Sequence, residues 1–363
     1  MQFRWRHFVV ILCVAVAIVA TREATYAHSP RVPQWLSKTG LYDVDGRLDP
    51  GNLHYSPQYP LWTDGAGKER WIYLPPGSKI DVSNADVWQF PVGTKLWKQF
   101  SFADHKVETR MIWHAAEDQW IFAAYRWNAE QTDAELAPEE GVRNSWEILP
   151  GRQHAIPSTS DCRTCHMGSP AIVLGFSALQ LSDDRDPNAL HGETPPADAV
   201  TLSGLEKRGR LKPARSDHLS KPPRIRTQDP IERTALGYLS ANCGNCHNDA
   251  GPLARLGLFL LHDDAAPAGA DEPARATTID AKGLWKVPGI PPDRSRIVAP
   301  GVPAHSSLHY RIASRRLASQ MPPLGTVIRD SVAVQLIDQW IENLAPSGAG
   351  TDGHSQQGAQ ASH

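Results

Sequence analysis

The sequence predicts an α+β multidomain protein, in which an N-terminal antiparallel β-sandwich-like domain precedes a mostly α-helical region. Nine of the twelve tryptophans fall between residues 28 and 150, in short β-prone runs that turn residues separate. Beyond residue 230, two segments place apolar residues with the period of an α-helix. We therefore divide the chain into a signal segment (1–27), a β-rich domain (28–150), a first motif segment with a connector (151–229), a helical domain (230–345) and a tail (346–363).

The first 27 residues are typical of a secretory signal. Arg4, Arg6 and His7 make its start basic, an apolar run follows from Phe8 to Ala20, and small residues precede the end. The run is shorter than the roughly 20 residues that span a bilayer. We expect cleavage and export to the periplasm, with no membrane span afterwards; an uncleaved anchor is the alternative.

Composition limits the classes of partner. The chain has 363 residues, of which 41% are hydrophobic, enough for two or three cores. A formal net charge of −2 gives no reason to expect nucleic acid as a partner. Thirty prolines and 27 glycines indicate many turns and long surface loops. The tail is rich in Gly, Ser and Gln, and we expect it to be disordered.

The β-rich domain contains a predicted hairpin. Its first strand alternates, with one face carrying Val107, Thr109, Met111 and Trp113 and the other Glu108, Arg110 and Ile112, which suits a half-buried strand. Residues 120–127 are its expected partner. Histidines and an acid in this domain suggest a copper or iron site as one possibility; these are His54, Asp64, His105 and His114. A packing or docking role is the preferred interpretation, because His105 and His114 lie about a strand length apart.

Two Cys-x-x-Cys-His pentapeptides carry the chemistry. They consist of Cys162, Cys165 and His166, and of Cys243, Cys246 and His247. In a c-type haem site, the two thiols bind the porphyrin vinyl groups and the histidine ligates the iron. The fifth cysteine lies in the signal segment, so every cysteine of the mature chain belongs to a motif. We predict two covalently attached haem c groups; a zinc site that pools four thiolates, or a disulfide, is the alternative.

The second motif has a recognisable context. A predicted helix from Ile231 leads into Cys243, and a second helix, capped by Asp330, continues to Leu344. Met321 stands before two prolines between them. This order resembles a class I cytochrome c, which implies His247 as the proximal and Met321 as the distal iron ligand. The stretch 256–300 is a long insertion relative to that plan.

The distal ligand of the first haem stays open. Met167 directly follows His166 and so starts on the proximal side. The remaining possibilities are an unligated position or one of six histidines, namely His54, His105, His114, His154, His191 and His218. The connector 189–229 is rich in Pro, Lys, Arg and Ser, and a solvated connector is preferred over a docking patch for an acidic redox partner.

Further stretches resemble a bacterial family of exported dihaem c-type cytochromes, some members of which are fused behind a sugar-dehydrogenase-like propeller that this chain lacks. Beside the two motifs and the segment around Met321, the matching stretches are 60–70 (PLWTDGAGKER), 90–97 (FPVGTKLW), 107–110 (VETR) and 125–128 (YRWN). The resemblance implies single-electron transfer in the periplasm with a redox partner protein, such as a dehydrogenase or an oxidase.

Two functions follow from these predictions. The preferred one is an electron carrier in which both haems relay single electrons. The alternative is a haem enzyme, similar to a dihaem peroxidase, with the first haem as the catalytic centre. Because a His/Met haem has no vacant coordination position, the enzyme hypothesis depends on the haem at His166.

Overall fold

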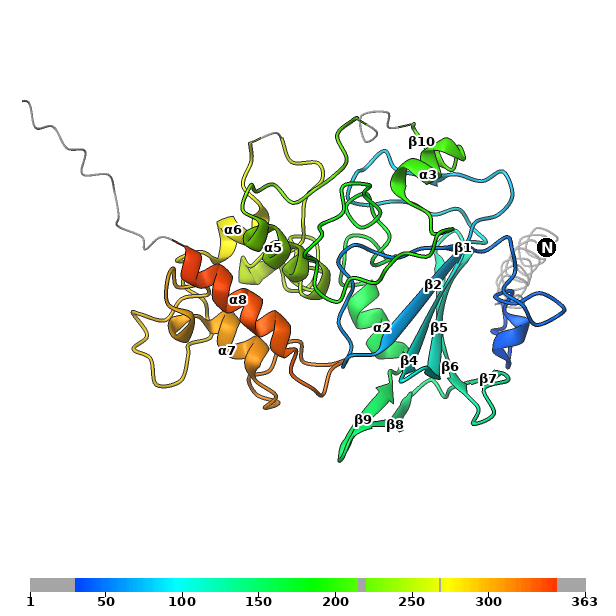
Figure 1. Cartoon of the computed structure of the whole chain (residues 1–363), viewed down its shortest axis with the longest axis horizontal. Coiled ribbons are helices and arrows are strands. Elements are labelled where there is room, and N and C mark those ends of the chain that lie inside the picture. The colour runs from blue at the N-terminus through cyan, green and yellow to red at the C-terminus, as the bar shows by residue number, and fades with distance from the viewer. Residues whose placement is uncertain (1–29, 215–219, 268, 345–363) are drawn as a thin grey trace, which may run out of the picture. The chain divides into compact units, whose positions relative to one another are not determined.

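A large antiparallel sheet fills the N-terminal half of an α+β fold (Figure 1). The computed structural model describes residues 30–214, 220–267 and 269–344. The predicted signal segment and tail lie outside the described residues. From Trp35 onward the described chain forms one unit. Within the part of the chain that the structure describes, no helix is both long and apolar enough to cross a membrane.

The main sheet has six strands in the order β1-β2-β4-β5-β6-β7, and all neighbours are antiparallel. The strands are β1 (Leu53–His54), β2 (Gly67–Tyr73), β4 (Lys95–Phe102), β5 (His105–Ala116), β6 (Gln119–Trp127) and β7 (Ala134–Leu136). The predicted hairpin is confirmed, because β5 pairs with β6 across a short turn. Strand β5 is covered on both faces, however, since Glu108 is as buried as Met111. The face that carries Glu108 forms a cavity wall, and not a solvated surface.

Loops, and not a second large sheet, cover one face of the main sheet. Two small sheets pair β8 (Val142–Leu149) with β9 (Arg152–Ile156), and β3 (Ile80–Asp81) with β10 (Leu211–Lys212). The first hydrophobic core joins Ile72 and Leu96 of the sheet to Phe176, Leu202 and Leu205. Helix α3 (Leu202–Lys207) supplies two of these residues. The connector thus contributes buried apolar side chains to the core instead of lying wholly in solvent.

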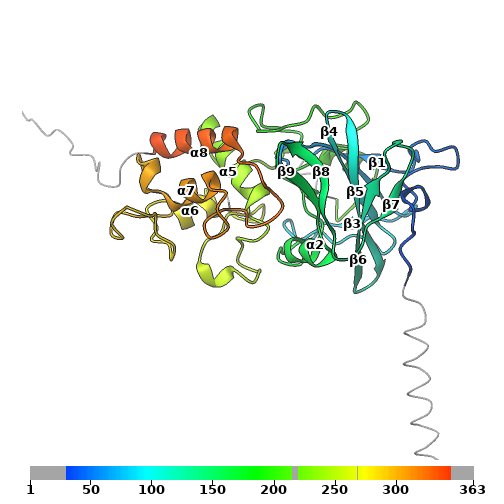
Figure 2. The same cartoon turned by 90° about the horizontal axis from the view of Figure 1, so that it is seen from below.

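Two helices of the C-terminal half agree with the sequence prediction. Helix α5 (Pro230–Asn242) begins after Asp229, whose carboxylate accepts from two backbone N–H groups. Helix α8 (Ser331–Asn343) begins after Asp330, which caps it as predicted. Figure 2 shows α5, α7 (Ser307–Ala313) and α8 side by side. Trp340 is buried in their core and donates from Nε1 to Glu232 Oε1 at 3.2 Å.

Helices occupy less of the C-terminal half than the sequence prediction of a mostly α-helical region requires. The others beyond residue 150 among the described residues are α2 (Thr159–His166), α3, α6 (Pro273–Thr278) and the short 3-10 helices η2 (Ala254–Leu256) and η3 (Pro303–His305). Proline and glycine explain the difference, because they interrupt helices and favour turns. The N-terminal half has one 3-10 helix, η1 (Leu36–Lys38), within the described range.

Candidate functional site

One cavity of about 1260 Å³ collects the residues that the sequence singles out. Typical small-molecule pockets measure roughly 300–1,000 Å³, so this cavity is large enough for an extended or a double ligand. All seven predicted site residues line it, namely Cys162, Cys165, His166, Cys243, Cys246, His247 and Met321. Folding has therefore brought two motifs about eighty residues apart to the same space.

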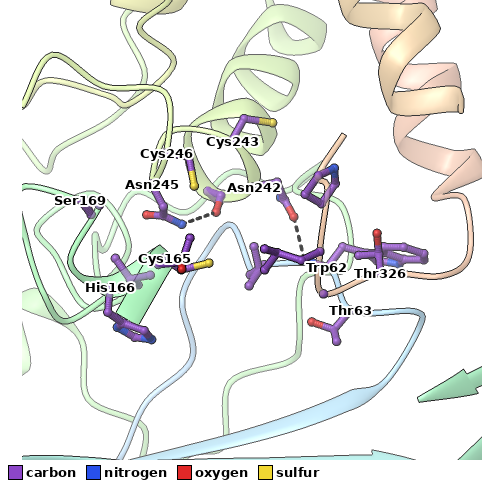
Figure 3. A pocket seen from close by; sticks show the side chains of 18 of the residues that line it. Trp62, Thr63, Cys165, His166, Ser169, Asn242, Cys243, Asn245, Cys246 and Thr326 are labelled. Atoms are coloured by element: carbon purple, nitrogen blue, oxygen red, sulfur yellow. Dashed lines mark hydrogen bonds between the residues drawn. The ribbon is translucent and has the colours of Figure 1, made fainter. Parts of the chain in front are cut away.

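The two motifs also touch each other. The side chains of Cys165 and Cys246 lie close enough that each thiol shifts the pKa of the other, and Figure 3 shows them on facing segments. Asn248, which directly follows His247, donates from Nδ2 to the carbonyl of Gly168 at 3.1 Å. A Cβ atom at Gly251 would lie 2.3 Å from the same carbonyl oxygen, so only glycine fits this approach. The backbones of the two motif segments are thus in direct contact.

The first motif lies on helix α2, which begins with a capping box. Ser158 Oγ accepts from the Asp161 N–H at 3.0 Å, and Asp161 Oδ2 accepts from the Ser158 N–H at 3.0 Å. A helix places positions i, i+3 and i+4 on one side, so Cys162, Cys165 and His166 share a face. That shared face is the one that lines the cavity.

The imidazole of His166 has the arrangement that an iron ligand needs. Its Nδ1 lies 2.6 Å from the carbonyl oxygen of Ile172, so Nδ1 carries the proton and donates it. Ligating histidines usually donate their second ring N–H in this way, which orients the ring and leaves Nε2 for the metal. Burial lowers the pKa of His166 to about 4. The charges of Lys98 and Arg110 also lower it, whereas the bond to Ile172 raises it. At neutral pH the ring is therefore uncharged, which is the form that binds iron.

The second motif begins where helix α5 ends. Cys243 caps the helix, and the His247 N–H donates to its carbonyl at 2.9 Å. The side chain of His247 is buried, and its Nδ1 has no hydrogen-bond partner. Burial, followed by the charge of Arg311, lowers the pKa of His247. A buried ring nitrogen without a partner is unusual in proteins, and it indicates that the protein alone does not satisfy this imidazole.

Backbone hydrogen bonds position Met321 at the cavity. Its N–H donates to the carbonyl of Arg311 at 3.0 Å, and Arg315 Nη1 donates to its carbonyl at 3.5 Å. Arg311 belongs to helix α7, so the methionine loop is attached to that helix. His247 and Met321, which the resemblance to class I cytochromes c pairs, thus line the same cavity from different segments.

The segment 60–65 links the second motif to the methionine loop. The Trp62 N–H donates to Asn242 Oδ1 at the end of α5, at 2.8 Å (Figure 3). Asp64 accepts from the N–H groups of Val327 and Ile328 at 2.9 and 2.8 Å. Burial raises the pKa of Asp64, although both bonds oppose the shift. The sequence predicted Asp64 only as a possible metal ligand and missed this structural link. The turn-forming stretch Thr-Asp-Gly was the signal that could have indicated a structural role.

The metal alternatives have no support in the described residues. No three His, Cys, Asp or Glu side chains of the described ranges converge as a metal ion requires, so neither a pooled zinc site nor a site at His54 and Asp64 is formed. The cysteines of both motifs are free thiols, so the described cysteines form no disulfide. Burial raises the pKa of the Cys243 thiol to about 12.

Most histidines considered as distal ligands have packing roles. His105 stacks on Trp146 with centroids 4.2 Å apart, and His114 stacks on Trp120 at 4.4 Å. In the described part of the chain, His154 is the one histidine of that set that lines the cavity, and it contacts Glu108 at 3.2 Å. His191 instead bonds Asp330 at 2.8 Å, and His218 lies outside the described residues.

Comparison of the chain with protein-family models, with curated proteins and with solved structures finds no match. The resemblance to exported dihaem cytochromes therefore stays a prediction from the sequence motifs. The shared cavity and the hydrogen bonds around His166 and Met321 carry the case for a function.

Proposed function

We propose that the chain is an exported dihaem c-type cytochrome that transfers single electrons between redox partners in the periplasm. Cys162 and Cys165 attach the first haem and His166 ligates its iron. The second haem is attached by Cys243 and Cys246, with His247 and Met321 as ligands. One observation carries the proposal: both motifs and Met321 line one cavity.

The residues around the cavity fit this cofactor. When bound, a haem supplies an iron that cycles between two oxidation states by one electron. The bond from His166 to Ile172 orients one imidazole, and the backbone bonds of Met321 to Arg311 and Arg315 hold the loop that carries the thioether. Because electron tunnelling weakens steeply with distance, adjacent attachment points favour transfer from one haem to the other.

We also propose that residues 230–345 correspond to a class I cytochrome c domain. Helices α5 and α8 pack against each other, and Trp340 is buried between them and the rest of the second core. The motif follows the first of these helices, and Met321 precedes the second. Long loops between them account for the low helical content.

The alternative function is catalysis at the first haem, as in a dihaem peroxidase. The observation that favours it is the charged sheet face beside His166, where Lys98 and Arg110 line the cavity. A relay is the preferred function, because a haem with His247 and Met321 as ligands has no vacant coordination position, which suits transfer and not catalysis. The partner would be a redox protein such as a periplasmic dehydrogenase or oxidase.

The cofactor is tested by mass. The mature chain is produced in a bacterium that attaches c-type haem, extracted with acid and acetone, and weighed intact. We expect the apoprotein mass plus two haems, whereas the apoprotein mass alone would overturn the proposal. Electron paramagnetic resonance then separates the functions: two low-spin haems that cyanide leaves unaltered support a relay, and a high-spin signal that cyanide converts supports an enzyme.

A further inference from the structure

A row of three cationic side chains crosses the main sheet on its cavity face. Arg70 of β2 pairs with Lys98 of β4, and Lys98 pairs with Arg110 of β5. Residues directly opposite in antiparallel strands share a face, with Cβ atoms about 4.5–5.5 Å apart. All three line the cavity. We call Arg70, Lys98 and Arg110 the cationic row.

The two ends of this row have carboxylate partners, and its centre has none among the described residues. Arg70 Nη1 lies 2.5 Å from Glu193 Oε2, and Arg110 forms an ion pair with Glu108. Lys98 Nζ instead lies 4.9 Å from the centroid of the Phe100 ring. Arg70 Nη2 is buried without a hydrogen-bond partner. Three cations therefore face two carboxylates, and donors remain available at the centre of the row.

Such a row is costly for a sheet. Like charges directly opposite each other destabilise paired strands, and a buried charge needs a partner to offset its desolvation. Burial, followed by the charges of Arg70, Lys68 and Arg110, lowers the pKa of Lys98 well below its ordinary value. An anion in the cavity would offset the repulsion between the cations, the desolvation of Lys98 and the fall of its pKa. It would form an ion pair with Lys98 and accept a hydrogen bond from the spare donor of Arg70.

The cationic row lies beside the first motif. Phe122 of β6 is on the same face, since its partner Ile112 is two residues from Arg110 along β5. The ring centroid of Phe122 is 5.2 Å from that of His166. The charges of Lys98 and Arg110 both act on His166. The part of the cavity between the sheet and helix α2 therefore holds the imidazole and the row together.

We propose that the cationic row is an oxyanion-binding site beside the first haem, in which Lys98 and Arg70 donate to a carboxylate or a similar oxyanion. This inference rests on the proposed function. The planar fork of a guanidinium matches the two oxygens of a carboxylate. The oxyanion has two possible sources: a propionate of the first haem, or a small diffusible anion that enters the cavity.

The test compares Lys98→Met and Lys98→Arg with a matched control, Lys95→Met. Lys95 is on the same strand, three residues away and therefore on the opposite face, and its Nζ donates to the Thr39 carbonyl at 2.7 Å. Each protein is purified as the mature holoprotein and weighed first. Failure of the wild type to carry two haems would count against the proposed function, whereas the measurements below test the row alone.

A propionate source predicts a change of potential. In Lys98→Met the propionate loses its cation, so the ferric state is favoured and the midpoint potential of the first haem falls. We expect about a tenfold change in the reduction equilibrium constant, which is about 59 mV for one electron. Lys98→Arg and Lys95→Met should keep the wild-type potential. Should Lys98→Met not accumulate, Lys98→Gln removes the same charge and is measured in its place.

A diffusible source predicts saturable binding. Acetate and nitrite are titrated into each holoprotein while the absorption and resonance spectra of the first haem are recorded. Wild type and Lys95→Met should then respond, with the affinity falling at least tenfold in Lys98→Met. The inference is overturned if Lys98→Met matches Lys95→Met in both potential and titration. It is also overturned if Lys98→Met turns a low-spin first haem high-spin, because the amine would then be an iron ligand.

Discussion

The Cys-x-x-Cys-His motif occurs in two different environments in this molecule. The first motif lies on helix α2 beside the main sheet, where Lys98 and Arg110 line the cavity. The second follows helix α5 and is surrounded by α7, α8 and the loop that carries Met321. The proposed attachment chemistry is the same in both, but the residues that surround the two motifs differ. In this proposal, axial ligation by Met321 sets the reduction potential of the second haem, and the nearby charges set that of the first.

The two regions also stabilise buried histidines differently. In the first, His154 contacts Glu108. Burial alone would raise the pKa of Glu108, but the charge of Arg110 and the bond from His154 outweigh burial and lower it. In the second, His262 bonds both Asp264 and Glu272. Burial opposes the charged form of His262, but these two acids raise its pKa to about 10. The first arrangement thus depends on a carboxylate staying ionised and the second on an imidazolium staying protonated.

The largest expected effect separates the two attachment sites. Replacing Cys162 and Cys165 with alanine should remove one covalent haem, and replacing Cys243 and Cys246 should remove the other, because each pair supplies its own thioethers. Intact mass and the haem-to-protein ratio measure the loss. We expect each variant to keep one haem. A variant that still carries two would contradict the assignment of its cysteines.

Met321→Ala tests the distal ligand of the second haem alone. A thioether bound to ferric haem gives a weak near-infrared charge-transfer band, and Met ligation raises the potential. We expect the band to vanish and the higher of the two potentials to fall. The matched control is Met167→Ala, because Met167 is 65% exposed. An unchanged band in Met321→Ala would show that another group ligates this iron.

Local patterns predicted the elements that depend on nearby residues. Helices α5 and α8 follow from apolar periodicity and from the caps Asp229 and Asp330. The β5–β6 hairpin follows from alternation across a short turn. These features depend on residues that are close together in the chain, so a single sequence is enough to predict them.

Other features depend on which distant segments meet. The contact of Cys165 with Cys246 and the pairing of Lys98 with Arg70 join residues that no local pattern relates. The connector shows the same limit: its charges predict solvation, yet a few apolar residues such as Leu205 and Leu211 enter the core. Its Arg226 is also engaged internally, with Nη1 donating to the Asp263 carbonyl at 2.6 Å. Tertiary packing decided these outcomes.

The buried histidine of the second region predicts a loss of stability at alkaline pH. A pKa raised from 6.5 to about 10 stabilises the fold fully below pH 6.5, and this contribution is lost as the pH rises through about 10. It is on the order of a few kcal/mol, at about 1.4 kcal/mol for each pH unit. Glu108, whose pKa is lowered, acts in the opposite direction, as its contribution is lost below about pH 4.5.

His262→Gln tests this assignment by chemical denaturation between pH 6 and 10.5. The variant should be less stable than wild type at pH 6, and the difference should shrink as wild type loses its imidazolium. His305→Gln, outside this cluster, is the control and should leave the pH profile unchanged. A constant difference across the range would show that His262 contributes through packing and not through charge.

The smallest expected effect concerns the contact that joins the two regions. Asn248 donates to Gly168 across the motifs and accepts from the N–H groups of Ala250 and Gly251 at 3.1 and 2.7 Å. Asn248→Ala leaves the buried carbonyl of Gly168 without this donor, which costs about 1–3 kcal/mol. We expect a lower melting temperature with both haems retained, because no attachment residue changes.

The same variant shows whether the contact serves electron transfer. If Asn248 holds the motifs together, Asn248→Ala should slow electron equilibration between the haems after partial photoreduction, while each potential stays close to wild type. Asn245→Ala is the matched control, since the Asn245 side chain donates to the Ala241 carbonyl within its own segment at 3.1 Å. Gly251→Ala should act like Asn248→Ala, because its Cβ would meet the Gly168 carbonyl. Equilibration at the wild-type rate in both would mean that the haems communicate by a route independent of this contact.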